Sequence, residues 1–446
     1  MEKNCYPKFS ISTIIKKGAY NLPEFQIINL NSGKLRSINN SALEILKLCN
    51  GLRSITEIIQ ILANYYSLQY NQNLNLKVMN FISRCRKEGF LDVHTKPAPS
   101  TQRIIEKRHS CSLDHIYFAL TNKCNFSCIY CYNPSNLKML SHREVALLLA
   151  QCNELGVLNV TLTGGEPLLV PYFSELIPQI IRYGMSYNLF TNGYLLKGSN
   201  LRTVLNYPPA LLCISIGSFK DSVLQKIALK PIYSNFYEKL LSKLTKYNIN
   251  LRVNCTLVPS INDSIKDIRE YELKLKNLGI ENILFSEVMS YGKGANISLR
   301  TSFNIAREIG ILQRSNCITT DTRQFSNNFE ITNYTGDPIC GTGTFLVSIL
   351  PNGNVVPCVV LQDIVVGNIF DESLSNIWNK SNLLKKYRIA VRINSKKCIK
   401  CKYIFYCRGG CKAKALMYSG KLNGPDLWSC SYFVGQESQK HSLSSI

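Results

Sequence analysis

Three cysteines on one short segment are the part of this sequence best suited to chemistry. Cys124, Cys128 and Cys131 are separated by three and two residues, and Tyr130 stands directly before the last of them. Three thiolates on one loop can bind three corners of a cubane iron-sulfur cluster and leave the fourth iron without a protein ligand. A substrate or cofactor can bind at such an open iron.

A second motif, Gly164-Gly165-Glu166-Pro167, follows the apolar segment 157–162, which we expect to be a strand. Glycine lets backbone approach a ligand closely, and Glu166 can accept a hydrogen bond from an ammonium group. Taken singly, the cysteines could hold a structural zinc or be buried thiols, and the glycines could form a plain turn. The two motifs together favour a ligand site.

The pair of motifs resembles the radical S-adenosylmethionine (SAM) superfamily. The resemblance implies that the open iron binds the amino and carboxylate groups of SAM, whose reduction releases a 5'-deoxyadenosyl radical that abstracts hydrogen. It also implies a set of SAM contacts, of which Ser215 and Asn254 would lie near the ribose and carboxylate; without the resemblance, Ser215 is simply a buried hydroxyl. These contacts are Tyr130 through its backbone, Gly164, Gly165, Glu166, Ser215 and Asn254.

The overall composition favours a cytosolic protein of two or three domains. The 446 residues exceed one ordinary core, and no charged-apolar leader or bilayer-spanning apolar run is present. In a cytosolic chain, 18 cysteines favour metal ligation over disulfides. The net charge of +23 suggests an acidic partner, but the excess is spread along the chain, so we expect a solvated surface and no nucleic acid.

Residues 1–95 are expected to form a winged-helix domain. Segments 25–30 and 34–38 alternate around Asn31-Ser32-Gly33 as a hairpin does, and three helices follow. Ser41 is expected to cap the first helix, and Ser54 or Thr56 to begin the second. The third has a stripe of Val78, Phe81, Ile82 and Cys85.

The sequence pattern at residues 37–46, 50–51, 55–58 and 88–91 resembles that of the peptide-recognition domain related to the pyrroloquinoline-quinone biosynthesis chaperone. That resemblance implies binding of a precursor peptide's leader as an added strand. A winged helix that reads DNA and an inert packing domain are the alternatives. The third helix offers few side chains suited to base edges, which disfavours DNA.

After a linker at 96–112, residues 113–329 are expected to form the catalytic core. Apolar strands are predicted at 115–121, 157–162, 187–190, 211–216, 251–257 and 283–288, with helices between them; Ser141 and Glu144 form a capping box before Gly156 ends the first of these helices. Alternating strands and helices predict a parallel α/β sheet. Resemblance to the superfamily refines this to a partial (β/α)6 barrel similar to a TIM barrel, with ligands where the strands end.

Residues 330–446 carry seven ordered cysteines, which indicate metal binding. Zinc ribbons would explain the paired spacings, but Gly353 and Cys358 resemble the auxiliary-cluster extension called SPASM. That resemblance implies two further four-iron clusters: Cys398, Cys401, Cys407 and Cys430 on one, and Cys340, Cys358 and Cys411 on the other. Cys317 is the nearest thiol that could complete the second set; Asp337 suits iron less well, and otherwise one iron is open.

The domain order resembles maturases of ribosomally made peptides, and most closely the subtilosin-type sactisynthases, which join a cysteine sulfur to an alpha carbon. It implies three four-iron clusters, SAM, a precursor peptide and an electron donor such as ferredoxin or flavodoxin. Alternatives are a thioether to a beta or gamma carbon, a carbon-carbon crosslink, epimerisation with Cys213 or Cys255 as hydrogen donor, a sulfatase activator, or an iron-sulfur regulator that binds DNA. No acid-base residue is assigned.

Overall fold

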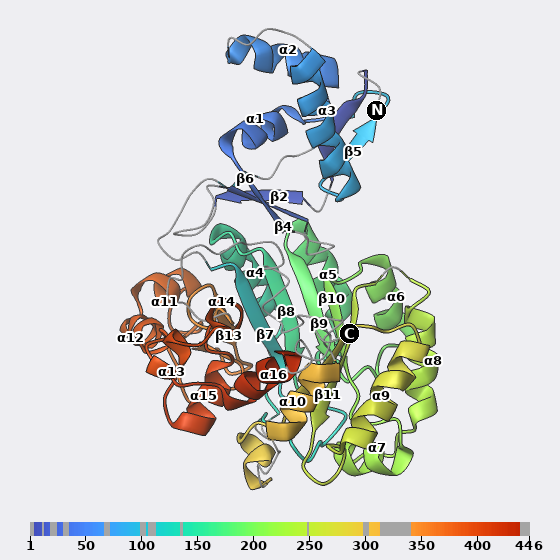
Figure 1. Cartoon of the computed structure of the whole chain (residues 1–446), viewed down its shortest axis with the longest axis vertical. Coiled ribbons are helices and arrows are strands. Elements are labelled where there is room, and N and C mark those ends of the chain that lie inside the picture. Colours follow the sequence, from blue (N-terminus) through green and yellow to red (C-terminus); the bar gives the residue numbers. More distant parts are fainter. Residues whose placement is uncertain are drawn as a thin grey trace, which may run out of the picture. The chain divides into compact units, whose positions relative to one another are not determined.

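The computed structural model describes residues 4–10, 13–17, 25–29, 35–66, 72–98, 104–105, 113–133, 137–247, 249–297, 303–312 and 340–437. The chain divides into two compact units between Ser112 and Leu113. Figure 1 shows the elements of both.

The first unit combines short antiparallel strands with three helices. Strand β1 (Tyr6–Phe9) pairs with β5 (Leu91–His94), and β6 (Ile104–Ile105) joins β2 (Thr13–Lys17) in parallel. The predicted hairpin is confirmed as β3 (Phe25–Asn29) and β4 (Leu35–Ile38), although its turn lies outside the described residues. The buried core includes Phe9, Ile15, Ile27, Leu46, Ile58, Ile82 and Phe90.

The helices of this unit are α1 (Asn40–Leu48), α2 (Ile55–Tyr65) and α3 (Gln72–Lys87). Ser54 caps α2 in a capping box with Glu57, which confirms the first of the two predicted starts, Ser54 or Thr56. The prediction that Ser41 caps α1 is wrong, because Asn39 accepts the hydrogen bond from the Ala42 amide at 2.9 Å. Asparagine caps as well as serine does, and the helix has already begun at Asn40.

The second unit contains the six predicted parallel strands, each within about two residues of its expected bounds. They are β7 (His115–Thr121), β8 (Asn159–Gly164), β9 (Ser186–Thr191), β10 (Leu211–Ser215), β11 (Leu251–Leu257) and β12 (Ile283–Glu287), paired in chain order. The partial-barrel prediction is therefore confirmed. The helices that follow them are α4 (His142–Glu154), α5 (Phe173–Arg182), α6 (Gly198–Asn206), α7 (Asp221–Ala228), α8 (Ser234–Leu244) and α9 (Ile265–Asn277).

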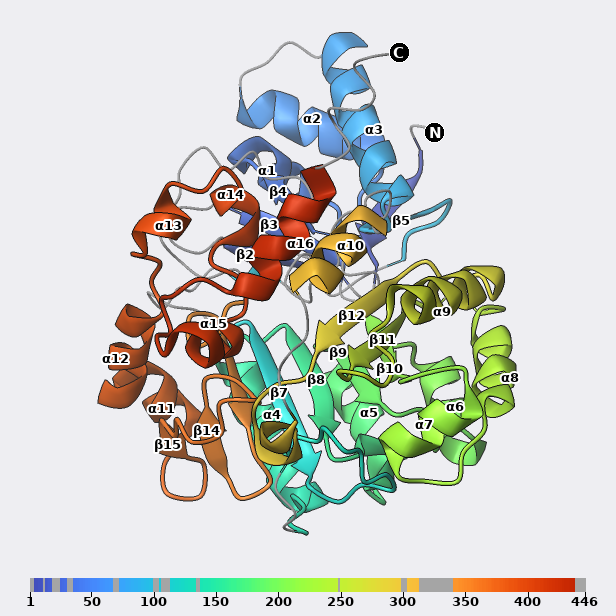
Figure 2. The ribbon, with the colours of Figure 1, turned by 60° about the horizontal axis from the view of Figure 1, so that its bottom comes forward.

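The two faces of this sheet differ in chemistry. Helices α4 to α9 cover one face of the sheet (Figure 2). That face is apolar and includes Ile116, Phe118, Val160, Leu162, Leu189, Ile214 and Val253. The opposite, inner face carries polar side chains: Tyr117 lies beside Thr161, Thr161 beside Asn188, and Ser215 beside Asn254. A barrel interior lined with polar groups is suited to a polar ligand rather than to a packed core.

Three strands that we did not predict extend the sheet. Strand β13 (Leu346–Ile349) pairs in parallel with β7, and β14 (Asn354–Val356) and β15 (Gly367–Asn368) follow antiparallel. The remaining elements are α10 (Phe303–Leu312), α11 (Leu374–Lys380), α12 (Asn382–Ala390), α13 (Lys396–Ile399), α14 (Ile404–Cys407), α15 (Lys412–Ser419) and α16 (Leu427–Glu437). Among the described helices, none has the length and apolar character that crossing a bilayer requires.

Candidate functional site

Cys124, Cys128 and Cys131 lie on the loop that follows β7, where the parallel strands end. The loop is fastened to the end of α7: the Ser127 amide donates to the Ala228 carbonyl at 3.1 Å and the Ile129 amide to Ile227 at 3.0 Å. Cys124 is exposed, and Cys128 and Cys131 are partly buried. A short loop held by its backbone can present three thiols without help from their side chains.

The thiols of this loop are close enough to affect one another's ionisation. Burial raises the pKa of Cys128 to about 12, and the neighbouring Cys124 and Cys131 contribute to the rise. Cys124 is exposed as a residue, but partial desolvation of its sulfur raises its pKa to about 11. Bound iron would stabilise the thiolate forms of Cys124 and Cys128, which burial and the neighbouring thiols disfavour, so the loop suits an iron centre.

A lysine after β12 reaches back to this loop. The backbone amide of Lys293 donates to the Cys131 carbonyl at 2.8 Å, and its ammonium donates to the Ser127 hydroxyl at 2.7 Å. Gly292 (φ +56°) precedes it, and a Cβ atom there would come within 2.6 Å of the same carbonyl. The segment therefore closes against the cysteine loop only because residue 292 is glycine.

Gly164 and Gly165, the two glycines of the second motif, lie in close contact with the backbone at Thr121 and Lys123. A Cβ atom on Gly165 would lie 2.2 Å from the Lys123 carbonyl oxygen, and one on Gly164 (φ +130°) 2.3 Å from that of Thr121. The Gly165 amide donates to Thr121 and the Glu166 amide to Lys123. These glycines thus let the loop after β8 press against the start of the cysteine loop, a role that we had not predicted for them.

Glu166 is fully buried between the loops after β8 and β9. Its carboxylate accepts from the Thr191 hydroxyl at 2.7 Å, the Asn192 amide at 2.9 Å and the Leu168 amide at 3.1 Å. Burial raises its pKa to about 7, and these three hydrogen bonds oppose the rise. Asn192 also approaches the Cys124 sulfur at 3.8 Å, so Glu166 positions a neighbour of the cysteine loop.

The other predicted SAM contacts lie around the same end of the barrel. Tyr130 packs with Ile227, Val258 and Val288. Ser215 is exposed at the end of β10, beside Asn254, whose Oδ1 atom is buried without a hydrogen-bond partner among the described residues. An unpaired buried oxygen costs free energy unless a ligand completes it, which makes the inner face suited to binding a polar molecule.

The seven cysteines of the tail form two sets. In the first set, burial raises the pKa of Cys411 to about 12, and Asp426, Cys358 and Cys340 add to the rise. In the second set, burial raises the pKa of Cys407 to about 12, and Asp426, Cys430 and Cys398 add to the rise. Burial raises the pKa of Cys430, and Cys401 contributes to the rise, so Cys401 also belongs to the second set. The structure therefore brings together the groups expected from the sequence, while Cys317 and Asp337 lie outside the described residues.

Lys412 lies between the two sets. Its side chain is 1% exposed, and its ammonium has no hydrogen-bond partner among the described residues. Burial lowers its pKa, and four thiols from both sets oppose this: Cys340, Cys398, Cys407 and Cys411. A buried, unpaired ammonium is costly, so anionic clusters at these cysteines would supply the countercharge that the residue otherwise lacks.

In the described part of the chain, no three Cys, His, Asp or Glu side chains converge as the ligands of a single metal ion do. A cubane requires a wider arrangement, because each thiolate binds a different iron. The donor set of the three groups, all sulfur, suits iron-sulfur clusters.

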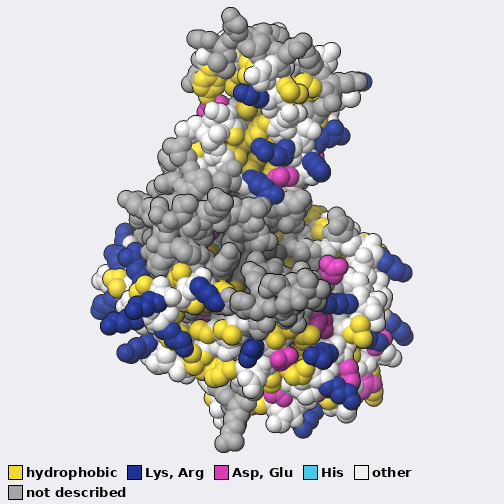
Figure 3. Space-filling view, viewed as in Figure 1, with side chains coloured by type: hydrophobic (Ala, Val, Ile, Leu, Met, Phe, Trp, Pro, Cys, Tyr) yellow, Lys and Arg dark blue, Asp and Glu magenta, His cyan; other side chains and the backbone are white. Residues whose placement is uncertain are grey.

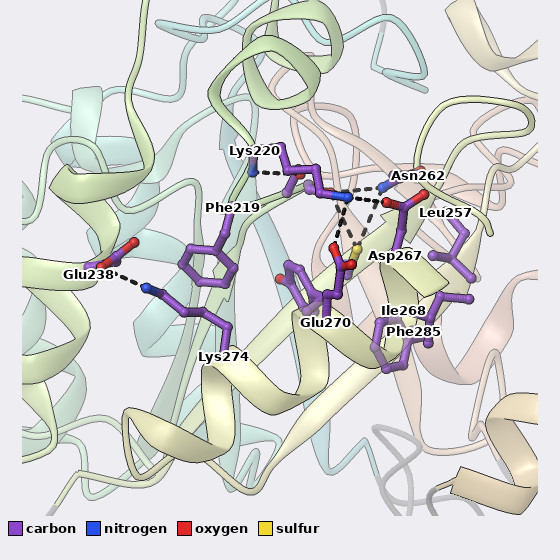
Figure 4. A pocket seen from close by; sticks show the side chains of 14 residues that line it. Phe219, Lys220, Glu238, Leu257, Asn262, Asp267, Ile268, Glu270, Lys274 and Phe285 are labelled. Carbon is purple, nitrogen blue, oxygen red and sulfur yellow. Dashed lines mark hydrogen bonds and ion pairs between the residues drawn. The ribbon is translucent and has the colours of Figure 1, made fainter. Parts of the chain in front are cut away.

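The two candidate hydrogen-donor cysteines lie on opposite faces of the sheet. Cys213 alternates with Ser215 and therefore belongs to the inner face. Cys255 lies on the helix side, 3.6 Å from the Asn262 amide nitrogen, and lines a pocket of about 230 Å³ beneath α9. Figure 4 shows that pocket bordered by the ion pairs of Lys220 with Asp267 and Glu270. It is not part of the barrel interior.

Sequence reasoning missed three residues of these sites. Lys293 and Asn192 belong to loops after β12 and β9 and approach the cysteine loop only through the fold. Lys412 directly follows Cys411, so its position was visible, but nothing in the sequence shows that it is buried.

Comparisons with known proteins match each part of the chain. Residues 118–271 match the Radical SAM superfamily, residues 340–403 match SPASM, an iron-sulfur cluster-binding domain, and residues 24–91 match coenzyme PQQ synthesis protein D (PqqD).

Two curated relatives come from Bacillus subtilis. The antilisterial bacteriocin subtilosin biosynthesis protein AlbA is 25% identical over 314 residues, covering 68% of this chain and 68% of AlbA. The sporulation killing factor maturation protein SkfB is 26% identical over 283 residues, covering 62% and 66%. Among solved structures, Streptococcus suis SuiB bound to precursor peptide SuiA aligns with a TM-score of 0.63 at 14% identity, over 94% of this chain and 98% of that one, and so shows the same fold.

Proposed function

The chain is a radical SAM peptide-modifying enzyme with a SPASM domain and an N-terminal PqqD-like domain, and on this premise we propose that it forms cysteine thioether crosslinks in a ribosomally synthesised precursor peptide. The observation that carries the proposal is the combination of seven tail thiols in two sets with a three-cysteine loop at the barrel end. We take the domains to be 1–95, 113–329 and 330–446, joined by the linker 96–112.

In this proposal, Cys124, Cys128 and Cys131 bind the first cluster, and the seven tail cysteines bind two auxiliary clusters. When bound, the first cluster and SAM supply a 5'-deoxyadenosyl radical. Lys293 and Asn192 fix the loop that presents these thiols. The SAM contacts remain those expected from the sequence, with Ser215 and Asn254 on the inner face.

The peptide's leader is proposed to bind the first unit. Within the described residues, β4 is an edge strand of the four-stranded sheet, with β3 on one side only. An extended peptide can add to such an edge through backbone hydrogen bonds. The match of residues 24–91 to PqqD and the fold likeness to SuiB, whose structure contains a precursor peptide, support this assignment.

Thioether formation explains why auxiliary clusters are needed. One hydrogen atom leaves a peptide carbon for the adenosyl radical, the cysteine thiol loses a proton, and the new carbon-sulfur bond releases one electron. Two thiol sets in the tail offer a place for that electron. Epimerisation returns a hydrogen atom to carbon and needs no such acceptor.

The test is expression of the chain with each short reading frame beside its gene, followed by mass spectrometry of the peptide. We expect a cysteine-containing peptide to lose two hydrogen atoms per crosslink and to fragment as a thioether, and we expect Cys124→Ala to abolish the loss. A product with unchanged mass, or neighbouring peptides without cysteine, would contradict thioether formation.

One observation favours a second outcome. Cys213 lies on the inner face, two residues from Ser215, where a hydrogen donor for epimerisation would be required. Epimerisation in deuterated water would replace one carbon-bound hydrogen of the peptide with deuterium, so the peptide would gain one mass unit instead of losing two, and Cys213→Ala would prevent it. The same spectra therefore distinguish the two outcomes.

A further inference from the structure

The tail contains a long segment without any acidic residue. From Ser373 to Pro425 the sequence has 13 lysines and arginines and no aspartate or glutamate. This one segment therefore supplies 13 of the chain's 23 net positive charges. The net charge of the whole tail is less positive per residue than that of this segment, because all acidic residues of the tail lie outside it.

Eight of these cations are exposed on helices α11 to α13 and the turns beside them, and we call this set the basic face. Its members are Lys380, Lys385, Lys386, Arg392, Lys396, Lys397, Lys400 and Lys402. Figure 3 shows Lys and Arg side chains gathered on this side of the second unit, without Asp or Glu among them. Asp426, the first acidic residue after the segment, is buried and does not lie on this surface.

Three cations of the basic face have no ionic partner among the described residues. In the part of the chain that the structure describes, Lys385, Lys386 and Arg392 form no ion pair and no side-chain hydrogen bond. Like charges held close together at a surface destabilise the folded chain slightly, and an acidic partner would reverse that effect.

The basic face surrounds one thiol set. Lys396 and Lys397 precede the buried Cys398, and Lys400 and Lys402 flank Cys401. A partner on this face would therefore dock beside Cys398, Cys401, Cys407 and Cys430.

We propose that the basic face is the docking surface for an acidic electron-carrier protein of the flavodoxin class. Electron transfer requires redox centres to come close, and the cysteines beneath this face are the tail's nearest candidate centre. One electron passes from the reduced flavin of the carrier, which is oxidised, to the enzyme's clusters, which are reduced. This inference rests on the proposed function for those clusters, but not on which peptide is modified. Complementary charge would raise the association rate by about 10-fold to 1,000-fold at low salt.

The test compares two triple variants of the reconstituted full chain. Lys385→Glu/Lys386→Glu/Arg392→Glu removes charge from the basic face without touching a residue beside a cysteine. Lys239→Glu/Lys243→Glu/Lys246→Glu makes the same net change at exposed positions on and just after α8. Affinity for oxidised flavodoxin is measured by calorimetry, and cluster reduction by reduced flavodoxin or dithionite is followed anaerobically by absorbance.

We expect the first triple to weaken flavodoxin binding and slow reduction by flavodoxin at least tenfold at low salt, with the loss disappearing at high salt. The α8 triple should stay within about twofold of the unaltered chain, and dithionite should reduce all three alike. The proposal would be overturned if both triple variants lost flavodoxin affinity and reduction rate equally, or if neither did. It would also be overturned if the basic-face variant no longer bound anionic phosphatidylglycerol vesicles but was still reduced by flavodoxin at the normal rate. Failure of peptide modification with normal flavodoxin kinetics would count against the proposed function and leave the docking surface supported.

Discussion

The cysteine loop of the barrel and the cysteines of the tail place their thiols in different surroundings. Cys124 is exposed, and the loop is held from outside by Lys293, whose ammonium hydrogen-bonds Ser127. In the tail, Cys398 is buried and the other six cysteines are partly buried. Lys412 is enclosed between the two sets with no hydrogen-bond partner among the described residues. The difference suits an open centre that must admit a cofactor and closed centres that only exchange electrons.

The largest effect should come from removing whole ligand sets. We expect about twelve irons per reconstituted chain, from three four-iron clusters. Cys124→Ala/Cys128→Ala/Cys131→Ala should leave about eight irons and no SAM cleavage. A variant with alanine at Cys398, Cys401, Cys407 and Cys430 should also hold about eight, yet still cleave SAM when dithionite is the reductant. Iron analysis and chromatography of the products measure both; loss of all iron in either variant would contradict separate sites.

Lys412→Met should have the next largest effect. Removing a buried positive charge disfavours the reduced, more negative state of the clusters nearby, so their midpoint potential should fall by about 60 mV or more, which is tenfold in the reduction equilibrium. Redox titration followed by electron paramagnetic resonance measures this. Lys412→Arg should restore most of the potential, and Lys421→Met, at an exposed position, should not change it.

Gly165→Ala tests the contact between the two barrel loops. The added Cβ atom would meet the Lys123 carbonyl oxygen at 2.2 Å, so the backbone must move, at a cost of about 1–3 kcal/mol. We expect lower thermal stability and weaker retention of the first cluster. Gly198→Ala, where a Cβ atom would have no neighbour within 4 Å, is the control, although its φ of +55° carries a smaller cost. Equal losses of cluster in both variants would refute the close-contact explanation.

Lys293→Met should have the smallest effect of the four. Its ammonium is exposed, so solvent screens its charge, and the backbone bond to Cys131 survives the substitution. We expect the midpoint potential of the first cluster to fall by less than half of the change at Lys412. A larger fall than at Lys412 would show that burial does not set the influence of these two lysines.

The sequence predicted the six parallel strands of the barrel well. Apolar residues recur along β7 and at every second position of β11, which is why both strands match their expected bounds. The grouping of the seven tail cysteines into two sets was inferred from resemblance to the SPASM extension. Strands β14 and β15 are too short to show a pattern, and β13 pairs with β7 across more than 200 residues, which no local signal can indicate.

Other features depend on contacts that sequence alone does not contain. The neighbours of Gly164 and Gly165 turned out to be Thr121 and Lys123, because the loops after adjacent strands meet at one end of the sheet. The burial of Lys412 likewise follows from packing. The basic face, by contrast, was present in the sequence but hidden by counting charges over too long a segment.

Reductive cleavage of SAM tests the central claim most directly. The purified chain, reconstituted with iron and sulfide and reduced under anaerobic conditions, should convert SAM to methionine and 5'-deoxyadenosine, and Cys128→Ala should not. A fully loaded, reduced protein that leaves SAM intact would contradict the account.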